Sequence, residues 1–96
     1  MDTVGSKMNA LVERGAPRDF TDVYRLVRDG AVSMASCWEW WKRKNPGRTM
    51  EEGKQKIHLH LAGLERRRPL DSIRDPADRE SAGDLRRWFQ DVFLKL

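Results

Sequence analysis

Residues 7–26 read KMNALVERGAPRDFTDVYRL, and this stretch decides the fold that we predict. Apolar residues recur at the spacing of one helical face on both sides of Gly15, Ala16 and Pro17. Gly15 suits the left-handed conformation that ends many helices, and the following proline turns the chain. The stretch therefore predicts two short amphipathic helices that meet at a corner.

The corner carries more charge than a turn requires. Its charged residues are Lys7, Arg14, Arg18, Asp19 and Asp22. Asp19 and Asp22 fall in the first turns of the second helix, where the helix dipole favours negative charge, and their spacing places them on one face. The residues alone leave two interpretations open. Either the charges form ordinary ion pairs, such as Asp19 with Arg14 or Arg18 and Asp22 with Arg25, or the corner binds a ligand.

Helical periodicity continues along the rest of the chain, and β-branched alternation is absent. The predicted helices cover residues 3–13, 18–28, 33–44, 49–67 and 76–96, with a linker at 69–76. We expect an all-α fold, a small bundle of about five helices joined by short turns, in one domain over residues 1–96. The single-domain expectation also follows from the length of 96 residues.

Start signals mark the two C-terminal helices. Thr49 and Glu52 fit a capping box, in which the hydroxyl and the carboxylate each bind a free backbone amide. Asp75 fits an N-cap, with Pro76 at the first helical position. The last helix carries the most regular apolar stripe, which consists of Leu85, Trp88, Phe89, Val92 and Leu96.

Composition narrows the class of protein. Nineteen Lys and Arg against fifteen Asp and Glu give a net charge of +4, which suits an anionic partner or a solvated surface of mixed charge. The single cysteine, Cys37, excludes an intrachain disulfide and is expected to be buried. The chain has no apolar run of the ~20 residues that a membrane span needs, and its first residues lack a signal-peptide core. We expect a cytoplasmic protein with no membrane partner.

The spaced residues of the corner form one pattern, Lys7-x-x-Ala10-Leu11-x-x-Arg14-x-x-x-Arg18-Asp19-x-x-Asp22-x-Tyr24-x-Leu26. This pattern resembles the C-terminal motifs of the AbiEii/AbiGii-type nucleotidyltransferase toxins, members of the DNA polymerase β-like nucleotidyltransferase superfamily. Proteins of that family pair a catalytic α/β domain with a helical portion. The resemblance covers about a quarter of the chain closely.

The resemblance implies a function and a site. Lys7 and Arg18 would bind the phosphates of a nucleotide, and Asp19 and Asp22 would be catalytic, orienting the site or acting as a base. The full-length family uses an NTP and magnesium to transfer a nucleotidyl group to RNA, beside an antitoxin, in phage defence. The implied partners are a catalytic domain or an antitoxin protein, and RNA.

The chain departs from the family pattern in the catalytic half. It has no Gly-Ser loop to bind a triphosphate and no Asp-x-Asp strand to bind magnesium. The only near match, between Asp71 and Asp75, has the wrong spacing and lies in the linker. We therefore expect the α/β half to be missing, with no nucleotide transfer and no cofactor in this chain alone. The alternative function is a stand-alone helical module that binds protein or nucleic acid.

Three further groups of side chains are candidates for binding. Trp38, Trp40 and Trp41 would either stack on bases beside residues 42–44 or belong to the core or a domain interface; Trp38 and Trp41 fit the core stripe and Trp40 does not. His58 and His60 are two apart on a helix and point to nearly opposite sides, so we predict no metal site. The basic run at residues 66–68 would either extend a surface for RNA with Lys54, Lys56, Arg86 and Arg87, or end its helix in solvent.

Overall fold

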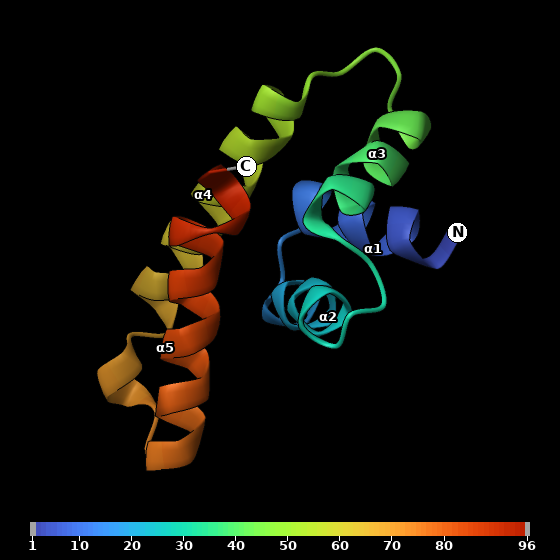
Figure 1. The fold of residues 1–96 in the computed structure, drawn as a ribbon. Helices are drawn as coiled ribbons and strands as arrows, with labels where there is room; N and C mark the ends of the chain where they lie inside the picture. The colour runs from blue at the N-terminus through green and yellow to red at the C-terminus, as the bar shows by residue number, and fades with distance from the viewer. Residues whose placement is uncertain (1, 96) are drawn as a thin grey trace.

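Five α-helices make up most of residues 2–95, the part of the chain that this computed structural model describes (Figure 1). They are α1 (Asp2–Glu13), α2 (Pro17–Arg28), α3 (Met34–Lys44), α4 (Met50–Arg67) and α5 (Pro76–Asp91). Two short 3₁₀ turns, η1 (Leu70–Ser72) and η2 (Phe93–Lys95), complete the order, and the described residues include no strand. The predicted all-α bundle is confirmed. No helix within residues 2–95 has the length and apolar character to cross a bilayer.

Helix α1 lies at the centre of the molecule, packed against α2, α3 and α4. Its buried side chains are Val4, Met8, Leu11 and Val12, none more than 1% exposed. Gly5 of α1 faces α3: a Cβ there would lie 3.5 Å from the Trp40 carbonyl oxygen, an ordinary contact, and 2.7 Å from Cε of the flexible Lys44 side chain. Helices α4 and α5 run antiparallel beside this group (Figure 1), and the Gln90 amide of α5 donates to the Glu65 carboxylate of α4 at 2.6 Å.

The turn between α1 and α2 is formed as the sequence predicts. Gly15 has φ of 60°, and its Cα faces the ring of His60 so closely that a Cβ would lie 2.2 Å from the His60 Cγ. The His60 Nε2 is 3.0 Å from the Val12 carbonyl oxygen at the end of α1. Glycine is therefore required here both by conformation and by space. His58 is exposed on the other side of α4.

A continuous array of aromatic rings joins α2, α5, η2 and α3. Tyr24 contacts Trp88 at 5.2 Å between centroids, and Trp88 contacts Phe93 at 5.1 Å. Phe93 in turn stacks on Trp38 at 5.6 Å, and Trp38 meets Trp41 edge-on at 5.5 Å. Trp38 and Trp41 are buried, which confirms their place in the core and removes them from any surface for stacking bases.

The C-terminal helix is shorter than predicted. Helix α5 ends at Asp91, and Val92 is its C-cap, with φ of −121° and ψ of −65°. Val92 is 41% exposed, so its place in the buried stripe was wrong, while Leu96 lies outside the described residues. The 3.6-residue period stops where the helix stops, and η2 instead buries Phe93 and Leu94. The predicted linker likewise contains a structured turn, η1.

Of the two predicted helix starts, the one at Asp75 is confirmed in full and the one at Thr49 in part. The Asp75 carboxylate accepts the Ala77 amide at 2.8 Å, which confirms the N-cap. The Thr49 hydroxyl accepts the Glu52 amide at 3.2 Å. The Glu52 carboxylate accepts from the Thr49 hydroxyl at 3.3 Å rather than from the backbone amide. The half of the predicted capping box that Thr49 supplies is present, and the half that Glu52 would supply is not. The Glu52 carboxylate instead lies 3.9 Å from Arg48 Nε.

Candidate functional site at the α1–α2 corner

The charged residues of the corner surround one surface hollow of about 240 Å³. Its lining consists of Ser6, Lys7, Ala10, Arg14, Arg18, Asp19 and Asp22. We call this feature the corner hollow. Helix α1 supplies one wall and the first turns of α2 supply the other. The structure therefore brings together the four residues to which the resemblance gives site roles, Lys7, Arg18, Asp19 and Asp22.

Asp19 is the most constrained of these residues. It is only 3% exposed, and its Oδ1 and Oδ2 accept hydrogen bonds from Arg14 Nη2 at 2.7 Å and Arg14 Nε at 2.9 Å. The Asp19 Oδ2 also accepts the backbone amide of Ala16, the N-cap of α2, at 2.9 Å. These hydrogen bonds, those from Arg14 above all, hold the pKa of Asp19 below its ordinary value despite its burial. Asp19 thus fixes the turn as a permanently ionised group at neutral pH.

Asp22 is paired across the corner rather than along its own helix. The Lys7 Nζ donates to Asp22 Oδ2 at 3.1 Å, which joins α1 to α2. The described residues do not form the predicted pair between Asp22 and Arg25. Both side chains remain partly exposed, Lys7 by 37% and Asp22 by 28%. A pair this open to water contributes little to stability, about 0–1 kcal/mol, and exchanges partners readily.

Arg18 is the uncommitted cation of the corner. It is exposed and forms no ion pair within residues 2–95, while Arg14 and Lys7 are engaged with the two carboxylates. Its charge contributes only as the last of the causes that lower the pKa of Asp19. The three cations and two carboxylates leave one positive charge at the corner hollow. This charge is mobile, because it stands on a long exposed side chain.

The corner does not fit a magnesium ion. Both oxygens of Asp19 already accept hydrogen bonds from cationic or amide donors, and Asp22 faces the ammonium of Lys7. Magnesium needs carboxylate oxygens free to enter an octahedral shell. No group of three His, Cys, Asp or Glu suited to a metal occurs in the described chain. The catalytic roles implied for Asp19 and Asp22 stay predictions.

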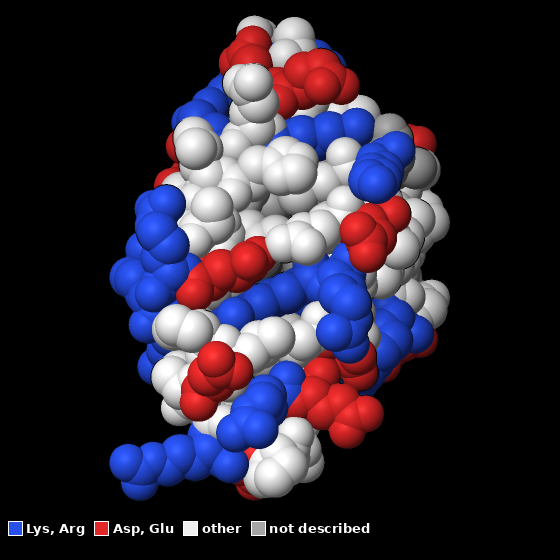
Figure 2. All heavy atoms as spheres, turned by 90° about the vertical axis from the view of Figure 1, so that its left-hand side faces the viewer, with Lys and Arg blue, Asp and Glu red and all other residues white. Residues whose placement is uncertain are grey.

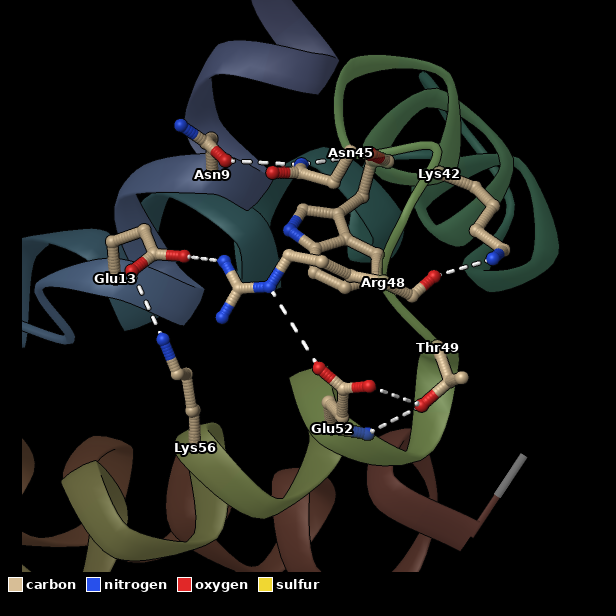
Figure 3. A network of polar contacts seen from close by, with 9 residues as sticks. Asn9, Glu13, Lys42, Asn45, Arg48, Thr49, Glu52 and Lys56 are labelled. Atoms are coloured by element: carbon tan, nitrogen blue, oxygen red, sulfur yellow. Dashed lines mark hydrogen bonds and ion pairs between the residues drawn. The ribbon is translucent and has the colours of Figure 1, made fainter.

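A second polar network lies at the junction of α1, α3 and α4 (Figure 3). Glu13 accepts from the Arg48 guanidinium and, at 3.1 Å, from Lys56 Nζ. The hydrogen bonds from Arg48 and then Lys56 lower the pKa of Glu13. The Arg48 guanidinium also lies 5.9 Å from the centroid of the buried Trp41 ring. Sequence reasoning missed this network because its members are far apart along the chain.

Asn45 ends α3 in the same region. Its side-chain amide donates to the Trp41 carbonyl at 2.9 Å and to Asn9 Oδ1 at 3.1 Å (Figure 3). The network therefore joins the end of α3 to α1 as well as to α4. All its charged groups have partners, which indicates a structural role.

The remaining sequence candidates are accounted for by packing. Trp40, which the core stripe left unexplained, is half-buried and has the Arg43 guanidinium 4.7 Å from its ring centroid. Cys37 is buried, and burial raises the pKa of its thiol to about 11, so it is an inert core residue.

The proposed extended basic surface is broken up. Lys56 pairs with Glu13, Arg87 pairs with Asp84, and Arg86 is buried. Figure 2 shows the side of the molecule that lies on the left of Figure 1, where Lys and Arg are interspersed with Asp and Glu. This face is a surface of mixed charge rather than a continuous basic track.

No family model, curated protein or solved structure matches the chain. The resemblance of the corner to the nucleotidyltransferase toxins therefore stays a prediction.

Proposed function

We propose that the chain is the helical part of a nucleotidyltransferase of the AbiEii/AbiGii type, and that its corner hollow binds the phosphates of a nucleotide. One observation supports this proposal: Lys7, Arg18, Asp19 and Asp22 line the same hollow. In this proposal Arg18 is the free cation that meets the phosphates first. Lys7 then exchanges its exposed carboxylate partner for a phosphate oxygen, at small cost.

The two carboxylates have different tasks in this proposal. Asp19 positions Arg14 and the start of α2 through its buried hydrogen bonds, so it shapes the hollow. Asp22 shares Lys7 with the incoming phosphate and therefore competes with it. A catalytic domain would supply the reacting carboxylates and bind magnesium and the RNA acceptor. An antitoxin would be the regulatory partner, in the cytoplasm. The chain alone transfers no nucleotide.

Titration of the chain with ATP, followed by calorimetry and by amide chemical shifts, tests the proposal. The double variant Lys7→Gln/Arg18→Gln should weaken binding about tenfold, because two charge-assisted contacts to phosphate are lost. Asp22→Asn should strengthen binding, because it frees Lys7 and removes a repelling charge. The matched control is Arg66→Gln/Arg67→Gln, which removes two exposed cations that do not line the corner hollow.

The outcome that contradicts the proposal is equal weakening by both double variants, since binding would then be non-specific. Weaker binding by Asp22→Asn would contradict the competing role of Asp22. Incubation with labelled NTP, magnesium and RNA should leave the RNA unlabelled. Labelling that Asp19→Asn or Asp22→Asn abolishes would show that the chain is itself catalytic.

A further inference from the structure

A groove runs between α2 and α5, away from the corner hollow. It consists of two hollows, of about 140 Å³ and about 410 Å³, which share Thr21, Ala82 and Leu85 as lining residues. Because the same three residues line both, the hollows adjoin one another along α2 and α5. We call this feature the arginine groove.

Every charged residue that lines the arginine groove is an arginine. Arg25 and Arg28 stand at one hollow, and Arg68 and Arg86 stand at the other. No Asp or Glu lines either hollow. Arg25 has no ion pair within the described residues. Arg28 has a loose ion-pair contact, 3.8 Å from Asp29, with both side chains exposed, and its guanidinium lies 5.3 Å from the centroid of the Tyr24 ring. This local excess of positive charge is much stronger than the chain's net charge suggests.

Arg86 is a buried cation without a carboxylate. It is 8% exposed and occupies the core-facing side of α5, between Gly83 and Phe89, which are both buried. Its Nη2 donates to the Arg68 carbonyl at the end of α4, at 2.8 Å. This is the one hydrogen bond of its guanidinium to residues 2–95, although arginine carries five N–H donors. Within residues 2–95, no Arg86 nitrogen is among the fully buried side-chain atoms that lack a hydrogen-bond partner. Its remaining N–H donors therefore reach solvent and are available to a ligand in the hollow.

The floor of the groove is aliphatic. Ile73, Ala82 and Leu85 are half-buried there, so each presents apolar surface at the bottom of a cationic rim. Such a floor accepts leucine-like side chains and offers no stack for bases, because Tyr24, at one end, is already covered by Trp88 and Arg28. The combination of an aliphatic floor and an arginine rim favours a partner that is both apolar and acidic over a single strand that binds by base stacking.

We propose that the arginine groove binds an acidic amphipathic segment of a partner protein. Apolar side chains of the segment fill the floor at Ala82 and Leu85. Carboxylates on either side of them meet Arg25 and Arg28 at one end and Arg68 and Arg86 at the other, where the guanidinium fork suits a carboxylate. This binding surface is separate from the corner hollow and does not depend on the function proposed for it.

Fluorescence anisotropy with a labelled peptide that combines glutamate and leucine in an amphipathic pattern tests this inference. The wild-type chain should bind the peptide saturably. Arg25→Gln/Arg28→Gln should weaken binding about tenfold, since both cations are at the rim. Arg66→Gln/Arg67→Gln is again the matched control and should leave binding unchanged. Two control peptides, with Gln for Glu or with Ala for Leu, should each bind at least about tenfold more weakly.

Peptide binding by the variant Arg86→Lys is a second test, and circular dichroism verifies that this variant is folded. Lysine retains the charge but loses the fork, so weaker peptide binding with an intact helical spectrum supports the assignment. If this variant unfolds, Leu85→Asp gives the same test at the half-buried floor, by repelling the peptide, with its fold verified in the same way. No saturable binding at millimolar peptide would overturn the inference. Equal loss in the Arg66/Arg67 control, or tighter binding of a single-stranded RNA than of the peptide, would also overturn it.

Discussion

Arg14 and Asp19 face each other across the turn between α1 and α2, joined by two hydrogen bonds of 2.9 and 2.7 Å. The arginine is exposed and the aspartate is buried. The pair therefore places a charge in the interior and leaves its partner at the surface. Because Asp19 also caps α2 through the Ala16 amide, one carboxylate fixes both the turn and the helix start.

Replacing Asp19 should cost far more stability than replacing its neighbour. We expect Asp19→Ala to lower the free energy of unfolding by about 2–3 kcal/mol, since it removes a cap and buried charge-assisted hydrogen bonds. Asp22→Ala removes a partly exposed pair and should cost less than about 1 kcal/mol. Urea denaturation at neutral pH measures both values. Equal losses would mean that the corner contributes as a unit rather than through Asp19.

Acid should destabilise the chain through Asp19 and Glu13. The pKa of each is lowered in the folded protein, from ordinary values of 3.8 and 4.5. Their stabilisation is complete above these unfolded values and is lost as the pH falls through the lower folded values. The free energy of unfolding should thus decrease as the pH falls below about 4.5. Asp19→Asn should show a smaller decrease between pH 7 and acid than the wild type. An unchanged pH dependence in this variant would assign the effect to other carboxylates.

Gly15 and Gly30 form a matched pair for testing close packing. Both have positive φ, 60° and 77°, so alanine strains the backbone at either position by about 1 kcal/mol. A Cβ at Gly15 would meet the His60 ring at 2.2–2.5 Å, whereas nothing lies within 4 Å of one at Gly30. Thermal unfolding should therefore show a clearly larger loss for Gly15→Ala than for Gly30→Ala. Similar melting temperatures for the two variants would mean that α4 yields easily at His60.

Trp41 should tolerate phenylalanine much better than alanine. Its indole Nε1 is buried and has no hydrogen-bond partner, so the donor contributes nothing that Phe lacks. Trp41→Ala empties a fully buried site and should cost about 3–5 kcal/mol, while Trp41→Phe should cost less than half as much. Chemical denaturation ranks the two. If both variants lose the same stability, the indole has a partner such as an ordered water.

The helices could be predicted from the sequence because their signals are local. Gly15, Asp75 and the turn before Arg48 mark helix ends within a few residues. The end of α5 has no such signal, since neither Gly nor Pro follows Asp91. The sequence therefore indicated a helix through Val92, where the chain turns to bury Phe93.

The candidate sites were predictable to different degrees. The sequence placed the corner residues on facing helices, but it left open whether Arg14 or Arg18 pairs with Asp19. In the structure it is Arg14 that lies within hydrogen-bond distance of Asp19. The pairing of Glu13 with Arg48 could not be predicted either, because the two are 35 residues apart. The arginine groove gave one usable signal, the position of Arg86 between buried Gly83 and Phe89 on α5. A cation on an apolar helix face is rarely placed there without a role.

The central position of α1 affects how the chain is made. Helix α1 is synthesised before the other four helices, yet two of its three neighbours, α3 and α4, come from residues 34–67. The contact of His60 with the Val12 carbonyl spans 48 residues, so it forms only after more than half of the chain has emerged. Until then the apolar face of the nascent helix is open to water. It is therefore the segment on which a chaperone would act, and on which premature release would cause aggregation.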